Sequence, residues 1–160
     1  MTVRTTLLGM LVWASTALLP LTVATAQSDM PYPSTLVFET GKPFEAYVDD
    51  LKAAVSANRM GVVAQASATR GAASIGKTIA GNAVIMVFRP DFAVRMLEAS
   101  VPAGIEAPIR LYVTEQSDGS AILTYRTPSS LFAPYDVDAL DEMAAELDLI
   151  FEQIVGDSMD

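Results

Sequence analysis

The sequence predicts a two-layer α+β sandwich: a largely antiparallel five-stranded sheet with two main helices on one face and a short extra helix. Three observations lead to this fold class. Amphipathic helical patterns follow Pro43 and cover residues 137–155. Residues 83–88 are all apolar, which is typical of a strand covered on both faces. Asp118-Gly119 separates two more strand patterns, as in a β-hairpin. No repeat or linker divides these elements, so we expect one domain.

The first half of the domain contains a clear amphipathic helix. Its apolar residues recur every three or four positions: Phe44, Tyr47, Val48, Leu51, Ala54 and Val55. Pro43 suits the position at which this helix begins. The expected elements are a strand at 35–38, a turn at 39–43, this helix to about residue 58, a strand at 62–70, and a glycine-containing loop at 71–81 that can hold one helical turn.

The second half begins with the strongest strand and ends with the longest helix. The expected elements are a strand at 82–88, a helix at 90–100, a loop at 101–108, strands at 109–115 and 120–127, a loop at 128–135 and a helix at 137–155. We expect Asp136 to cap the last helix and Gly156 to end it. Residues 136–160 carry nine acidic residues and no basic one. A solvated surface is the simplest interpretation, with a basic partner or a loose cation site as alternatives.

The N-terminus has the form of a secretory signal peptide. Arg4 precedes an uncharged, largely apolar stretch, and Ala24-Thr25-Ala26 resembles a cleavage site. The alternative is an uncleaved membrane anchor, which Pro20 and the Ser, Thr and Ala content disfavour. The expected segments are a signal peptide at 1–26, a flexible lead-in at 27–34, a single domain at 35–156 and a tail at 157–160. We therefore expect a periplasmic or secreted protein.

Composition excludes several classes of function. The 160 residues include 19 acidic and 10 basic side chains, for a net charge of −9. Cleavage after residue 26 would remove Arg4 and leave −10. Such an acidic chain is poorly suited to binding nucleic acid or anionic lipid. The sequence contains no Cys and no His, which excludes thiol chemistry and removes the commonest general base and metal ligand. We predict no cofactor, metal or catalytic residue.

The predicted hairpin yields the candidate ligand-binding residues. If Asp118-Gly119 forms a two-residue loop, Ser117 pairs with Ser120 and Tyr112 lies opposite Tyr125. The two tyrosines would then share the helix-free face of the sheet and suit an aromatic or carboxylate ligand. The alternative is a cross-strand aromatic pair that only stabilises the sheet. The candidate ligand-binding residues are Arg110, Tyr112, Tyr125 and Arg126.

The apolar strand at 82–88 also predicts a covered second face. Its residues alternate between the two faces of the sheet, and the set on one face has no long helix to cover it. Either the helix at 90–100 folds over that set, or a second subunit does. A homodimer through the sheet face is therefore a hypothesis.

Residues 71–78 match the phosphate-loop pattern G-x-x-x-x-G-K-[ST], from Gly71 to Gly76-Lys77-Thr78. The context opposes a nucleotide site, because no parallel βαβ unit surrounds it and the chain is expected to be exported. A looser anion cradle with Arg70 and Lys77, or an ordinary loop, are the other interpretations. Ser74 and Lys77 could also meet on a helical turn as a catalytic pair. An enzyme that uses the loop at 70–78 stays open as an alternative.

Several segments together resemble the domain-of-unknown-function family 302 over roughly residues 35–135. They are Phe38-Glu39-Thr40, Val84-Ile-Met-Val-Phe-Arg-Pro90, Ala103-Gly-Ile-Glu-Ala-Pro-Ile-Arg-Leu-Tyr-Val113, Asp118-Gly119, Tyr125 and Thr127-Pro128. Arg89-Pro90 stands where the family pattern has Gly-Asn-Pro, and Ala107-Pro108 where it has Leu-Pro.

The resemblance implies a TATA-binding-protein-like α+β fold, and it implies a bacterial protein whose biochemical role the family does not establish. Some members carry His or Cys, and their metal or thiol roles do not transfer to this chain. We therefore expect an exported, non-enzymatic ligand-binding or protein-interaction module, periplasmic in a Gram-negative bacterium. A purely structural dimerising domain is the remaining alternative.

Overall fold

The computed structural model describes residues 32–160. The expected signal peptide and most of the lead-in lie outside this range. The elements are β1 (Thr35–Pro43), α1 (Phe44–Ala57), β2 (Gly61–Ala66), α2 (Ala68–Ser74), β3 (Asn82–Phe88), α3 (Pro90–Ala99), the 3₁₀ helix η1 (Val101–Glu106), β4 (Ile109–Glu115), β5 (Ser120–Arg126), α4 (Pro128–Phe132), the 3₁₀ helix η2 (Ala133–Tyr135) and α5 (Asp138–Met159).

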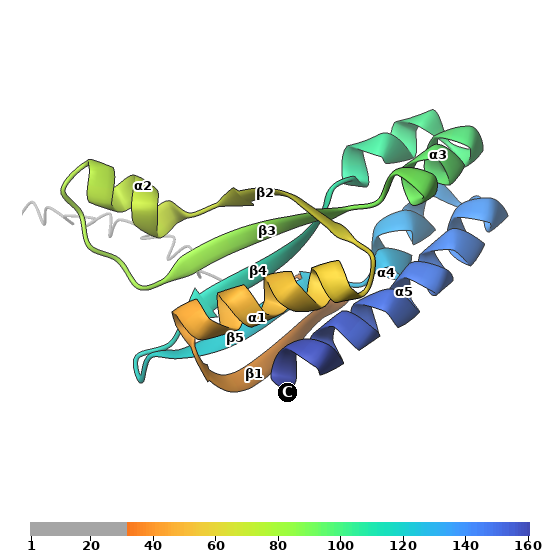
Figure 1. Ribbon diagram of the computed structural model, residues 1–160. Helices are drawn as coiled ribbons and strands as arrows, with labels where there is room; N and C mark the ends of the chain where they lie inside the picture. The colour runs from red at the N-terminus through yellow and green to blue at the C-terminus, as the bar shows by residue number, and fades with distance from the viewer. Residues whose placement is uncertain (1–31) are drawn as a thin grey trace, which may run out of the picture. The chain divides into compact units, whose positions relative to one another are not determined.

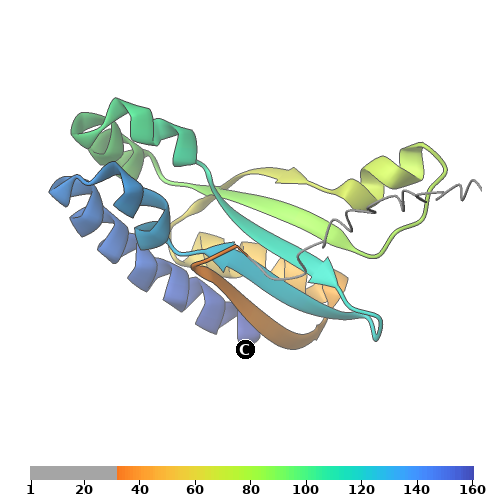
Figure 2. The ribbon, with the colours of Figure 1, turned by 180° about the vertical axis from the view of Figure 1, so that it is seen from behind.

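The five strands form one antiparallel sheet in the order β1-β5-β4-β3-β2. Helices α1 and α5 cover one face and pack against each other (Figure 1). Seen from behind, none of the helices within residues 32–160 crosses the other face, which we call the free face (Figure 2). Helix α2 lies beyond one end of the sheet, and α3 lies beyond the other. The predicted fold class is confirmed.

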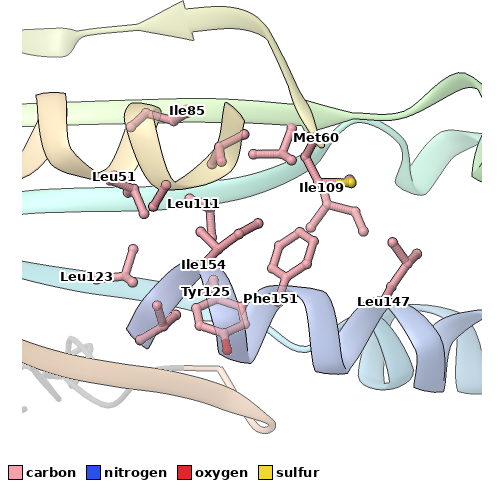
Figure 3. Packing of buried hydrophobic residues seen from close by; sticks show 14 of the residues in the cluster. Leu51, Met60, Ile85, Ile109, Leu111, Leu123, Tyr125, Leu147, Phe151 and Ile154 are labelled. Carbon is pink, nitrogen blue, oxygen red and sulfur yellow. The ribbon is translucent and has the colours of Figure 1, made fainter. Parts of the chain in front are cut away.

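A single hydrophobic core fills the space between the sheet and the two main helices. Leu51 of α1 and Phe151 of α5 meet Leu111 of the central strand β4 in this layer (Figure 3). All three are fully buried. Every second residue of β3 faces this core, namely Ala83, Ile85 and Val87. The helical stripe predicted for α1 is the buried face of that helix.

Strand β1 is longer than predicted, because the expected turn at 39–43 continues the strand. The pairing with β5 shifts between Glu39 and Pro43, so the strand contains a bulge. At the bulge the Thr40 hydroxyl donates a hydrogen bond to the carbonyl oxygen of Ala121, 2.8 Å away. This side-chain bond keeps the chain beside β5 where the regular backbone pairing lapses.

Strand β2 is shorter than predicted, and a helix follows it. Ser67 caps α2, because its hydroxyl oxygen accepts a hydrogen bond from the backbone N–H of Arg70. The alanines of α2 favour a helix even though none of its residues is buried. The predicted loops at 101–108 and 128–135 likewise contain η1, α4 and η2.

Helix α5 continues past Gly156, where the sequence predicts its end. Ser158 is fully buried, and its hydroxyl lies 3.0 Å from that of Tyr47 in α1. Val137, rather than Asp136, occupies the N-cap position. Packing against α1 therefore extends the helix through residues expected as a tail.

Helix α3 does not cover the free face, so the first of the two predicted covers, the helix at 90–100, is wrong. It packs on η1 and α5 instead. Arg95 of α3 forms a two-pronged ion pair with Glu146 of α5, with both N–O distances at 2.7 Å. With α3 packed beside the helical layer, Val84, Met86 and Phe88 stay half-buried on the free face.

Candidate functional site

The hairpin between β4 and β5 has a different register from the predicted one. Tyr112 lies opposite Thr124, and Leu111 lies opposite Tyr125. The backbone N–H of Gln116 donates to the Ser120 carbonyl at 2.8 Å, which leaves a three-residue loop instead of two. The left-handed residue of that loop is Gly119, with φ +84°. A three-residue loop with glycine in this position is a common hairpin form.

This shift moves Tyr125 to the other face of the sheet, so its predicted position on the free face is wrong. Tyr125 is only 4% exposed. Its ring stacks on Phe38, with ring centres 6.0 Å apart, and contacts Phe151 at 5.7 Å. Burial raises the pKa of its hydroxyl to about 12. The predicted Tyr112–Tyr125 pair does not exist, because neighbouring strand positions point to opposite faces.

Three of the four candidate residues lie on the free face, and all four border the same cavity. Arg110, Tyr112 and Arg126 line one cavity of about 380 Å³. A second, apolar cavity beside α3 measures only about 30 Å³, enough for one water molecule. The larger cavity is also lined by Tyr32, Thr35, Val84, Glu106, Thr124, Tyr125 and Leu131.

The register of β4 and β5 places the two arginines side by side. Continuing the pairing of Leu111 with Tyr125 by one residue brings Arg110 next to Arg126. Within residues 32–160, neither guanidinium forms an ion pair. The Arg126 guanidinium carbon lies 4.9 Å from the centre of the Tyr32 ring. Its Nε is buried and has no hydrogen-bond partner among the described residues.

The remaining polar groups of the cavity have partners nearby. The hydroxyl of Tyr112 accepts a hydrogen bond from the Asn82 side-chain amide. Glu106 accepts a hydrogen bond of 3.2 Å from the Tyr135 hydroxyl, which fixes its carboxylate at the cavity wall. The cavity thus contains two guanidinium groups and one carboxylate among predominantly apolar walls.

The sequence interpretation missed several cavity residues. Tyr32 and Glu106 belong to segments expected to be a flexible lead-in and a loop, where no periodicity assigns a face. Val84 could have been found from the sequence. The residues on both faces of its strand are apolar, so both faces need to be covered. Leu131 comes from α4, which the sequence predicts as a loop.

The loop that matches the phosphate-loop pattern does not have the strand–loop–helix context of such a site. Gly71 lies within α2, and Lys77 follows the helix instead of preceding one. The Ser74 hydroxyl donates to the Gly71 carbonyl at 2.6 Å, within its own helix, and has no hydrogen bond to Lys77 in the described chain. No observation on this segment favours catalysis.

Residues 32–160 contain no group of three or more His, Cys, Asp and Glu side chains placed to hold a metal ion. In the same range, no helix is both long enough and apolar enough to cross a membrane.

Comparison with known proteins identifies the family. The model of "Domain of unknown function DUF302" matches residues 36–155. The crystal structure of an uncharacterized conserved DUF302 protein from Bacillus stearothermophilus is similar, with a TM-score of 0.70 and 19% sequence identity. The match covers 79% of this chain and 98% of that one. No curated protein matches the chain. The matched residues begin one residue into β1 and end near the last turn of α5, so they include α1, most of α5 and nearly the whole sheet. The chain belongs to the DUF302 family.

Proposed function

We propose that this protein is an exported module that binds a small molecule in the cavity of its free sheet face. The observation that carries the proposal is the cavity itself. It measures about 380 Å³, within the size range of small-ligand sites, and it has apolar walls with a few polar groups. Export rests on the form of the first 26 residues.

The position of the cavity suits a preformed site. Its floor is made by β3, β4 and β5, whose backbones are fixed by pairing on both sides. Residues on such strands hold their geometry better than residues on loops. The walls come from η1 and α4, which rise at the end of the sheet.

A cavity-filling substitution tests the binding proposal. Thr124→Trp places a large side chain in the cavity, and Thr114→Trp places the same side chain on the free face outside it. Protein purified from its natural compartment should carry a bound small molecule in native mass spectrometry. Thr124→Trp should lose that molecule and Thr114→Trp should keep it. If neither the wild type nor Thr114→Trp carries a ligand, or if both variants retain it equally, the cavity is not a binding site.

N-terminal sequencing of the exported form tests export. We expect a mature chain that begins at Gln27. Recovery of the full-length chain from the membrane fraction would contradict cleavage and favour the anchor.

A homodimer through the free face is the second candidate, which Val84, Met86 and Phe88 support. They stay half-buried, and no helix of residues 32–160 lies over them. Val37 of β1 adds to this face and is 47% exposed. Light scattering after size exclusion at micromolar concentration should give twice the mass of the mature chain. Met86→Glu, which lies outside the cavity lining, should restore the monomer. A wild-type monomer contradicts the dimer.

A further inference from the structure

We infer that the ligand of this cavity is a singly charged organic anion with a flat apolar body, such as an aryl carboxylate, and that Arg126 is its main anchor. The inference rests on the proposed function, since it names the chemistry of the same site. Three features of the cavity support it: the pairing of the two arginines, the unpartnered Nε, and the shape and polarity of the walls.

The two arginines are adjacent, and neither forms an ion pair within residues 32–160 of this strongly acidic chain. Like charges on neighbouring strands disfavour the folded state. The chain has 19 acidic residues, yet no ion pair within residues 32–160 involves Arg110 or Arg126. An anion between the guanidinium groups would remove this repulsion. Such an arrangement is expected at a binding site, where stability is given up for function.

Arg126 has a buried donor with no hydrogen-bond partner among the described residues. A buried donor without a partner costs stability, and an ionised acceptor is the partner that compensates best. The Tyr32 ring lies 4.9 Å from the guanidinium carbon and covers one side of the group. The Nε has almost no exposed surface, so a carboxylate reaches it only after the side chains over it shift; it then matches the guanidinium with two parallel hydrogen bonds.

The balance of charge in the cavity selects a monoanion. Glu106 offsets one of the two guanidinium charges, which leaves one net positive charge among the lining residues. A carboxylate neutralises that charge, while a phosphate dianion would exceed it. Val84, Tyr112 and Leu131 supply apolar and aromatic surface for the body of the ligand.

A titration with three probes of one shape tests the ligand class. Benzoate, benzamide and benzylamine share a ring and differ in charge. Nuclear magnetic resonance of ¹⁵N-labelled protein should show a shift of the Arg126 Nε–H signal with benzoate. Benzamide should bind at least about tenfold more weakly, because it lacks the ionic hydrogen bonds. Benzylamine should not bind.

Variants separate the roles of the arginines from folding. Arg126→Gln and Arg110→Gln should each weaken benzoate binding by about tenfold or more. Arg126→Lys should also weaken it, since the charge stays but the fork is lost. Without ligand, the melting temperatures of the Gln variants should equal or exceed that of the wild type. Arg70→Gln, an exposed arginine outside this cavity, is the matched control and should bind benzoate as the wild type does.

The outcomes distinguish this inference from the proposed function. If benzamide or benzylamine shifts the cavity residues as strongly as benzoate, the cavity binds ligands but the anion assignment is wrong. If benzoate binds and Arg126→Gln binds it equally well, Arg126 is not the anchor. If no probe shifts any cavity residue and the purified protein carries no bound molecule, both the inference and the proposed function fail.

Discussion

Tyr125 and Arg126 are adjacent in the sequence and lie on opposite faces of the sheet. Tyr125 joins the core beside Phe38 and Phe151, while Arg126 lines the cavity of the free face. Their roles depend on one step in the register of β4 and β5. A one-residue shift exchanges every inward and outward position of a strand. The chemistry of each side chain follows from this: burial raises the pKa of the Tyr125 hydroxyl, and Arg126 lies next to Arg110 at the cavity.

The raised pKa of Tyr125 predicts a loss of stability in alkaline solution. An unfolded tyrosine ionises near pH 10, while the folded group ionises near pH 12. The contribution of un-ionised Tyr125 to the free energy of unfolding is therefore complete below pH 10 and falls as the pH rises toward 12. Tyr125→Phe should reduce this loss. Urea unfolding at pH 7, 9 and 11 measures it. The free energy of unfolding of the variant should rise relative to that of the wild type as the pH increases. A difference that stays constant across these pH values would contradict the prediction.

At the scale of elements, the ends of helices and strands depend on contacts that a local pattern does not contain. The hairpin loop has three residues, with Gly119 in the left-handed region at φ +84°. The helix α5 runs through Gly156 because Ser158 reaches a buried partner on α1. In both places the sequence correctly indicates the element. The loop is closed locally between Gln116 and Ser120, while the end of α5 depends on a partner far along the chain.

Two glycine substitutions should have opposite effects on stability. Gly119→Ala forces an L side chain into the left-handed region and should destabilise the fold by about 1 kcal/mol. Gly71 lies inside α2, and a Cβ there meets no atom within 4 Å. Gly71→Ala should therefore leave the fold intact and stabilise it by up to about 1 kcal/mol. Chemical denaturation of both variants measures these changes. Equal effects would show that backbone conformation does not decide them.

The hydrogen bond that anchors the last turn of α5 should also be measurable. The Ser158 hydroxyl donates to the Val155 carbonyl at 2.8 Å, so the buried Tyr47 hydroxyl donates to Ser158. Ser158→Ala leaves that phenol without its acceptor and should cost about 1–3 kcal/mol of unfolding free energy. Ser56→Ala removes an exposed hydroxyl that bonds only to its own helix, and should cost much less. A similar loss in both variants would contradict the anchoring role.

At the scale of the whole molecule, charge is unevenly distributed. The segment 136–160 contains nine acidic residues and no basic one, and the chain has a net charge of −9. Within the described residues, Arg95 gives this segment one ion pair through Glu146, and Lys42 donates to the Ser158 carbonyl at 3.2 Å near its end. Most of the acidic surface is therefore solvated, and its self-repulsion opposes the compact state.

This repulsion predicts that salt stabilises the protein. Raising NaCl from 10 to 200 mM screens charges beyond roughly 7 Å, within the range of separations on such a surface. The melting temperature at pH 7 should rise by a few degrees. Near the isoelectric point, about pH 4.3, the same salt change should have little effect. A melting temperature that does not depend on salt at pH 7 would contradict the prediction.

Local patterns determined much of this protein. The stripe of α1, the apolar run of β3 and the Asp118-Gly119 turn fixed the fold class, and Arg110, Tyr112 and Arg126 were all found as candidates. These features depend on the period of a helix or strand, which neighbouring residues set. Only the tertiary structure decided that Tyr125 belongs to the core and that Tyr32 and Glu106 belong to the cavity. Their positions follow from strand register and from the contacts between distant segments. A side chain becomes buried only when the segment that covers it has packed against it.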